Sequence, residues 1–193
     1  MDENKLKLAI EARISGAQGE FSGFRIVAKE RSVLMWSVYI VTMMWIWNRD
    51  FMGKFVTTIG SVVYVPGGEF SPTIESYALL NHELQHIQDS RKFGMPIWAF
   101  LYLFPQSLAP LALFAFWWPP AAIALVCLAP WPAPFRVWAE ARGYEEGLKT
   151  MVDWGLRPRV DWLEGVFTGW HYWRMAWRWE PLRKRFVKVA TGE

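Results

Sequence analysis

The sequence predicts a helix-rich α+β fold in a single domain of residues 1–193, and three observations lead to it. Two short runs rich in β-branched residues flank a glycine turn. Several longer segments repeat their apolar residues with the period of a helix. A long uncharged segment broken by prolines lies between them. Because 53% of the residues are hydrophobic, the chain can bury a core of its own. We therefore expect a short β-sheet or hairpin, amphipathic helices and an apolar helical hairpin.

The composition excludes several classes of protein. A single cysteine, Cys127, excludes a disulfide framework and a cysteine-rich metal cluster. With 20% charged and 17% aromatic residues the chain is not disordered. The pI of about 9.1 comes from scattered Lys and Arg, so we expect no nucleic-acid partner. No apolar segment follows the polar residues 1–5, so we expect no signal peptide. Nothing in the sequence indicates an oligomeric state.

The N-terminal region divides into a polar and an apolar part. Residues 1–31 form an N-terminal arm in which Leu6, Ile10 and Ile14 recur every four residues, which predicts an amphipathic helix. Residues 32–48 carry no charge and no proline, and their length of 17 is just below the ~20 residues that span a bilayer. We expect a helix packed in the core or against lipid there, although a buried strand fits the composition as well.

The following segment predicts two strands and a helix. Residues 55–59 and 62–65 lie on either side of Gly60 and a serine, which is typical of strands joined by a tight turn. A helix is expected over residues 71–93, because it opens with serine as the N-cap and proline at the first helical position. Gly94 supplies the stop.

This helix carries the motif HExxH, as His82-Glu83-Leu84-Gln85-His86. Residues four apart lie on one helical face, so His82 and His86 can bind the same zinc ion. Glu83, the next residue round the helix, can act as general base towards a metal-activated water and later pass the proton to the leaving amine.

A catalytic zinc site needs a third protein ligand. The metzincin continuation HExxHxxGxxH is excluded, because Asp89 and Lys92 stand at its glycine and third histidine positions. Glu140 is favoured as the ligand, because it directly follows the uncharged segment on a helix expected over 138–151 whose face also carries Tyr144. The remaining candidates are Glu145, Glu146, Glu164 and His171.

Three segments together resemble the compact gluzincin-type metallopeptidases of bacteria and phages: TTIGSVVYVP at 57–66, HELQH at 82–86 and WAEARGY at 138–144. The resemblance covers about residues 50–150, a metallopeptidase core with residues 94–135 inserted. It implies a minimal zincin-like fold with a short sheet, an active-site helix and a second helix that gives the glutamate ligand. It also implies zinc bound by His82, His86 and Glu140, Glu83 as the base, and a peptide or protein substrate that pairs with one of the strands at 55–65.

Two further roles stay open. Zincins need a donor for the oxyanion of the reaction, and His171, Tyr172 and Tyr144 are the candidates, with His171 favoured because an imidazolium can donate. Residues 169–173 also fit an aromatic core helix within the Trp- and Arg-rich C-terminal helices at 154–193, where Trp170, Trp173 and Trp177 share a face. Asp89 is a candidate for orienting a metal ligand.

The uncharged segment 93–135 contains eight of the twelve prolines. His86 precedes it and Glu140 follows it, so a single membrane crossing would place these ligands on opposite sides. We therefore expect a hairpin that enters and leaves a membrane on one side through residues 97–135, with Pro119-Pro120 at its tip. The alternative is a pair of helices that cap the core or lie in an oligomer interface. The protein is then membrane-associated, or cytoplasmic if this segment is buried.

The sequence thus predicts a zinc-dependent metallopeptidase that hydrolyses a peptide bond at or near a membrane surface. One alternative is a catalytically inactive zincin-fold membrane or assembly protein. Another is a Trp-rich membrane protein with an accidental HExxH. An intramembrane protease is excluded, because Glu75, Asp89 and Arg91 make the motif helix amphipathic.

Overall fold

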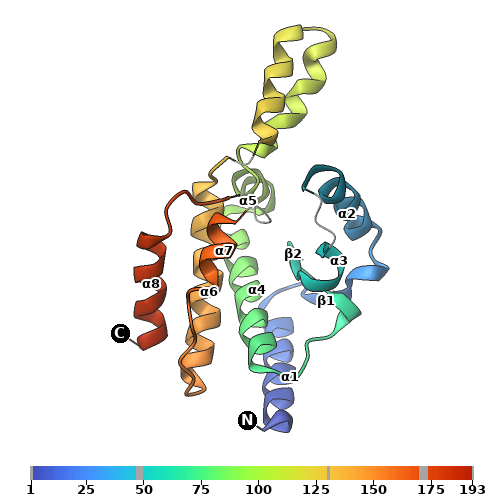
Figure 1. Ribbon diagram of the computed structural model, residues 1–193. Helices are drawn as coiled ribbons and strands as arrows, with labels where there is room; N and C mark the ends of the chain where they lie inside the picture. The colour runs from blue at the N-terminus through green and yellow to red at the C-terminus, as the bar shows by residue number, and fades with distance from the viewer. Residues whose placement is uncertain (1, 47–49, 130, 170–173, 193) are drawn as a thin grey trace.

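The computed structural model describes residues 2–46, 50–129, 131–169 and 174–192. It is 69% helical with a small three-stranded sheet, which confirms the predicted helix-rich α+β class (Figure 1). The helices are α1 (Glu3–Glu20), α2 (Val33–Ile46), α3 (Phe51–Lys54), α4 (Ile74–Phe93), α5 (Met95–Tyr102), α6 (Pro134–Asp153), α7 (Leu163–Thr168) and α8 (Glu180–Thr191). The strands are β1 (Arg25–Ala28), β2 (Thr57–Ile59) and β3 (Val62–Val65). The 3-10 helices are η1 (Lys29–Arg31), η2 (Pro66–Gly68), η3 (Gln106–Phe116) and η4 (Pro119–Leu128).

The sheet has the strand order β1-β3-β2. The predicted antiparallel pair is confirmed, with β2 and β3 joined at Gly60, whose φ of 62° favours glycine. β1 was not predicted and pairs in parallel with β3, Ile26 opposite Val63. A four-residue strand whose partner lies far along the chain leaves only a weak local pattern in the sequence, which is why only an amphipathic helix was predicted in the arm at 1–31.

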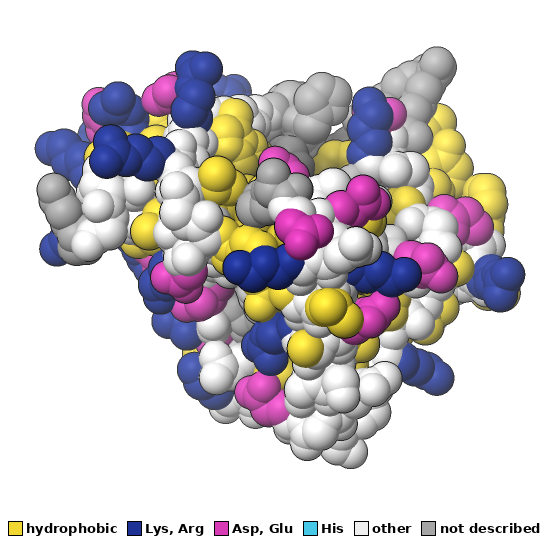
Figure 2. Space-filling view, turned by 90° about the horizontal axis from the view of Figure 1, so that it is seen from below, with side chains coloured by type: hydrophobic (Ala, Val, Ile, Leu, Met, Phe, Trp, Pro, Cys, Tyr) yellow, Lys and Arg dark blue, Asp and Glu magenta, His cyan; other side chains and the backbone are white. Residues whose placement is uncertain are grey.

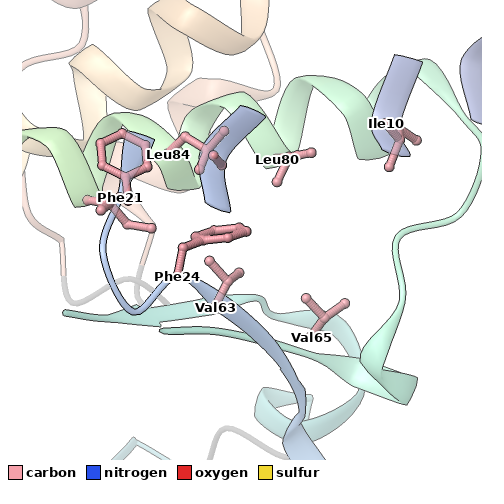
Figure 3. Packing of buried hydrophobic residues seen from close by; sticks show 9 residues of the cluster. Ile10, Phe21, Phe24, Val63, Val65, Leu80 and Leu84 are labelled. Carbon is pink, nitrogen blue, oxygen red and sulfur yellow. The ribbon is translucent and has the colours of Figure 1, made fainter. Parts of the chain in front are cut away.

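The first hydrophobic core lies between α1, α4 and the sheet. Ile10, Phe21 and Phe24 from the N-terminal region meet Leu80 and Leu84 of α4 over the sheet residues Val63 and Val65 (Figure 3). The apolar spacing predicted for α1 is confirmed, because Leu6 and Ile10 are buried and Ile14 packs against the cluster. The sheet and α1 together hold one side of the motif helix in place.

The motif helix α4 begins later than the sequence predicts. Thr73, not Ser71, is its N-cap: Thr73 has extended backbone angles and its hydroxyl accepts a hydrogen bond from the Ser76 backbone N–H. Ser71 and Pro72 therefore belong to the preceding loop. The helix ends before Gly94 at a φ of 77°, as predicted.

The other side of α4 is covered by α6, and α8 packs on the outer side of α6 (Figure 1). The predicted helix over 138–151 is confirmed within α6. A second core, which includes Leu148, Leu163, Phe167 and Phe186, joins α6, α7 and α8. Trp170 and Trp173 lie outside the described residues, so their predicted shared face is not part of the structure, and Trp177 is exposed.

A buried lysine fixes the chain between β1 and β2. The Lys29 ammonium is fully buried and donates to the backbone carbonyls of Phe51 and Phe55, with the Phe51 ring 3.6 Å from its nitrogen. Burial lowers the pKa of Lys29 to about 8. This contact holds the segment that leads into β2.

Only the middle of the uncharged segment forms a hairpin that projects from the body, shorter than the predicted 97–135, because α5 lies on the body and α6 begins at Pro134 (Figure 1). Its arms η3 and η4 lie side by side, and the turn at Trp117 and Trp118 comes immediately before the predicted tip at Pro119-Pro120. We call η3, this turn and η4, residues 106–128, the apolar hairpin. Its large side chains are exposed, so it does not cap the core as the alternative expectation had it. They are Leu111, Leu113, Phe114, Phe116, Trp117, Trp118, Ile123, Leu125 and Val126.

Within the described part of the chain, no single helix has the length and apolar character needed to cross a membrane. One pair passes the same criterion jointly, α5 with η3, and the two are bent by 88° where they meet. The stretch predicted as an apolar helix at 32–48 is helical as α2. At the end of the molecule opposite the hairpin, Lys and Arg intermingle with Asp and Glu on the surface (Figure 2).

Candidate metal centre

The two long helices α4 and α6 bring His82, His86 and Glu140 together. The Nε2 atoms of the two histidines are 3.0 Å apart. One Glu140 carboxylate oxygen lies 3.4 Å from His82 Nε2 and the other 3.5 Å from His86 Nε2. One ligand atom from each residue lies within 4.8 Å of the others, and all three side chains are buried. We call this group the candidate metal site.

A glycine on α6 makes the close approach of the helices possible. A Cβ atom at Gly143 would lie 2.8 Å from His82 Cε1 and Nδ1, closer than real Cβ atoms come. One turn further on, a Cβ at Gly147 would lie 3.3 Å from the Ala78 carbonyl oxygen. Glycines three and seven residues after the candidate ligand are a signal in the sequence for this close approach of α6 to α4.

The donor set fits a metal ion. Two imidazole nitrogens and one carboxylate oxygen are the ligands of many catalytic zinc sites. The Nδ1 atoms of His82 and His86 are buried without a hydrogen-bond partner among the described residues. The imidazoles are held by packing instead, since the His82 ring meets Tyr144 edge-on at 4.5 Å and the His86 ring lies 6.2 Å from Trp98.

The site is also electrostatically matched to a cation. Burial alone would raise the pKa of Glu140, but the charge of His86 and hydrogen bonds from both histidines hold it well below its usual value. For His86, burial opposes the charged form, but Glu140 outweighs it and raises the pKa. Glu140 is therefore an ionised carboxylate at neutral pH, the form that binds metal.

Tyr102, the last residue of α5, was not predicted as part of the site. Its hydroxyl donates to Glu140 Oε1, and its ring centroid is 6.3 Å from that of His86. Burial and the Glu140 charge raise the pKa of Tyr102, so the phenol stays protonated and remains a donor. Tyr102 is one of the few hydrogen-bonding side chains in the uncharged segment, and this was the signal that could have marked it.

The predicted base Glu83 is buried beside the histidines on α4 and is bound from the sheet. The Thr58 hydroxyl of β2 donates to Glu83 Oε2 at 2.6 Å. β2 is an edge strand, so this contact ties the motif helix to the open edge of the sheet. A single threonine in a short strand gave no signal of this role.

Asp89 does not orient a metal ligand as the sequence suggested, and it is fully buried. Its carboxylate accepts hydrogen bonds from Arg142 of α6 at 2.8 and 3.2 Å and pairs with Lys92. Burial would raise the pKa of Asp89, but these hydrogen bonds, led by Arg142, lower it. Asp89 therefore joins α4 to α6 rather than contacting an imidazole.

The other residues predicted as a third metal ligand or as an oxyanion donor are not part of the candidate metal site among the described residues. Glu145 pairs with Arg185 of α8 and Glu146 with Lys149, and neither belongs to the candidate metal site. Glu164 lies on α7, exposed and outside the candidate metal site. The proposed oxyanion donors His171 and Tyr172 lie outside the described residues.

Comparison with known protein families, curated proteins and solved structures finds no match. The chemistry of the site therefore has to follow from its own residues.

Proposed function

We propose that this protein is a zinc-dependent peptidase of the compact gluzincin type, with His82, His86 and Glu140 as the metal ligands. The observation that carries the proposal is the convergence of the two HExxH histidines with a glutamate from a separate helix. The donor set supports zinc, because two histidines and a glutamate leave a coordination position open for water or substrate. A short sheet, a motif helix and a glutamate helix in this order support the zincin-like interpretation of the fold.

The chain's own residues provide the proton transfers. A zinc ion bound here would act as a Lewis acid and lower the pKa of a water towards ~7. Glu83 accepts a proton from the attacking water and passes it to the leaving amine. The Thr58 hydroxyl, 2.6 Å from Glu83 Oε2, fixes the orientation of the carboxylate during both transfers. Tyr102 keeps Glu140 turned towards the histidines.

The substrate follows from the edge strand. β2 pairs with β3 on one side only, and Thr58 on it reaches the catalytic base. An extended peptide that adds to β2 would pass beside Glu83, and its main-chain groups would satisfy those of the strand. We therefore propose a peptide or protein substrate bound in the extended conformation.

A membrane-associated location belongs to the same proposal. The exposed apolar side chains of the hairpin support it, because a soluble monomer rarely exposes so many large apolar residues together.

The test measures zinc content and peptide hydrolysis in the same samples. We expect the intact protein to bind one equivalent of zinc and to cleave members of a peptide library assayed with lipid vesicles present. Glu83→Gln should keep the zinc and lose at least about a thousandfold in kcat, because it removes the general base but no ligand. His86→Ala should lose the zinc.

Three results would contradict the proposal. Failure to bind stoichiometric zinc would indicate an accidental HExxH. A Glu83→Gln variant as active as the parent would remove the assigned base. Zinc binding without hydrolysis of any library peptide would favour the alternative, an inactive zincin-fold membrane or assembly protein.

A further inference from the structure

Exposed apolar side chains extend beyond the hairpin to two other helices. On α2 they begin at the first helical residue and recur along the helix, and α5 adds more beside the metal site. These residues are Val33, Leu34, Trp36 and Ile40 on α2 and Ile97 and Phe100 on α5. We call the apolar hairpin together with these six residues the apolar surface.

The three parts of the apolar surface lie at one end of the molecule. In Figure 1, α2 and α5 occupy the end of the body from which the hairpin projects, and the N-terminus lies at the other end. Residues 32–48 and 93–135 carry no charged side chain. The opposite end carries charges of both signs (Figure 2). The two uncharged segments therefore lie at the end of the molecule opposite this charged face.

The hairpin is apolar all round rather than on one face. Phe116 on η3 is 87% exposed and Ile123 on η4 is 76% exposed, and the tip consists of two exposed tryptophans. A second copy of the chain would cover one face of such a hairpin, whereas lipid surrounds it.

The backbone of the tip fits an apolar medium as well. The N–H groups of Trp117 and Trp118 donate to the Phe114 carbonyl, and Ala121 N–H donates to the Trp118 carbonyl. Proline has no backbone N–H, so the prolines of the hairpin leave no such donor without an acceptor in lipid. Eleven residues of η3 at ~2.0 Å rise give a hairpin roughly 20 Å long, shorter than the ~30 Å apolar core of a bilayer. The hairpin can therefore enter a membrane and return without crossing it.

The base of the hairpin adjoins the metal site. Tyr102 binds Glu140, and η3 begins only four residues later at Gln106. Arg136 of α6 donates to the Tyr102 carbonyl at 3.0 Å and to the Gln106 side chain at 3.4 Å. Four residues span at most ~14 Å, so the candidate ligands lie close to the level at which the hairpin would enter lipid.

We propose that the apolar surface docks on a lipid bilayer and that the peptidase cleaves a membrane-anchored polypeptide just outside the apolar layer. α2 acts as a second contact beside the hairpin, which fixes the orientation of the body on the membrane. The substrate class rests on the proposed peptidase function, whereas bilayer docking does not depend on catalysis.

The single cysteine provides a probe for docking. Cys127 lies on η4 within the hairpin and can carry an environment-sensitive fluorophore. A Cys127→Ser background then allows Ile40→Cys on α2, 55% exposed, and the control Leu8→Cys on α1, 66% exposed but at the charged end. With vesicles of phosphatidylcholine and phosphatidylglycerol, we expect a blue shift and quenching by brominated lipid at Cys127 and at Ile40→Cys, and neither at Leu8→Cys.

Two outcomes would overturn bilayer docking as proposed. No response at Ile40→Cys would leave α2 outside the membrane contact. A lipid-independent dimer in light scattering, with no response at any position, would show that a second copy covers the apolar surface.

The substrate class is tested with one cleavable peptide in two forms, free in solution and lipid-anchored in the same vesicles. We expect cleavage of the anchored form to be at least about tenfold faster, because docking raises its effective concentration at the metal site. Ile40→Asp should lower the anchored-to-free ratio, whereas the matched Leu8→Asp should leave it unchanged. Thermal unfolding of both variants checks that they remain folded.

Failure of the membrane-anchored substrate and failure of the peptidase function give different results. Equal rates for the two forms, or a ratio that Ile40→Asp leaves unchanged, would overturn the membrane-anchored substrate while leaving the peptidase intact. Cleavage of neither form would overturn the peptidase function itself.

Discussion

Phe167 and Phe116 are the same side chain in two opposite environments. Phe167 of α7 is fully buried and contacts the rings of Tyr144, Trp179 and Phe186 in the core beside α6. Phe116 at the end of η3 is 87% exposed. Both segments are rich in apolar residues, so composition alone does not distinguish a core from a surface that awaits a partner.

The difference lies in what the neighbouring segments provide. The two helices that carry the candidate ligands, α4 and α6, combine apolar with charged residues, so each has a face for the core and a face for water. The hairpin has no charged face, and its two 3-10 helices, η3 and η4, pack mainly on each other. Apolar residues therefore form a core in the first region and an exposed surface in the second.

The sharpest test of this comparison is a matched pair of phenylalanine substitutions. Phe167→Ala should lower the free energy of unfolding by about 3–5 kcal/mol, because it removes a buried ring and leaves a cavity. Phe116→Ala should change it by less than about 0.5 kcal/mol, as exposed substitutions do. Urea unfolding followed by circular dichroism measures both values. A large loss at Phe116 without lipid would mean that the hairpin contributes to the folded core.

The sequence alone predicts candidate site residues where they follow from spacing within one helix. His82, Glu83 and His86 were identified from a four-residue spacing, and Glu140 from its position on the next amphipathic helix. The tip of the hairpin was located to within two residues, because prolines stop helices locally. These predictions needed no knowledge of how distant segments meet.

The parts that the sequence did not reveal depend on contacts between distant segments. Tyr102 and Thr58 reach the site from α5 and β2, and neither belongs to a motif. Asp89 was predicted to orient a metal ligand because it lies about one turn after His86, but its partner Arg142 is on another helix. β1 needs β3 to form a sheet at all. Tertiary packing, which has no short-range signature, decides each of these roles.

A substitution at Gly143 tests how closely the two metal-binding helices must approach. Gly143→Ala should weaken zinc binding by about a hundredfold, because the new Cβ would lie 2.8 Å from the His82 ring and displace a ligand. The control Gly16→Ala adds a methyl group to α1 where nothing lies within 4 Å. It should leave zinc binding unchanged and stabilise the helix slightly. Competition with a chelator measures the affinities; unchanged affinity in Gly143→Ala would show that the histidine does not need this space.

The ion pair between α4 and α6 is a feature that the uncharged hairpin cannot have. Asp89→Asn should lower the free energy of unfolding at pH 7 by about 1–3 kcal/mol, because Arg142 loses its buried charged partner. The pKa of Asp89 is lowered in the folded protein, so its contribution is present above the ordinary value of 3.8 and is lost as the pH falls below it. The difference in stability between the two proteins should therefore narrow as the pH falls below about 4.

The control for this ion pair is Glu146→Gln, which breaks the exposed pair with Lys149. It should cost less than about 0.5 kcal/mol, since exposed ion pairs contribute little. Equal losses in the two variants would mean that burial of Asp89 adds nothing to the joining of α4 and α6.

Tyr102 links the two regions directly, because it ends α5 at the base of the hairpin and binds Glu140. Tyr102→Phe keeps the ring but removes the hydroxyl, so Glu140 loses the hydrogen bond that orients it. We expect about a tenfold loss of zinc affinity, at the lower end of the range for a partner of a metal ligand. Tyr77→Phe on α4, whose ring packs on Trp154, is the control and should leave the affinity unchanged. If Tyr102→Phe binds zinc as tightly as the parent, α4 and α6 alone hold Glu140, and the base of the hairpin only adjoins the metal site without supporting it.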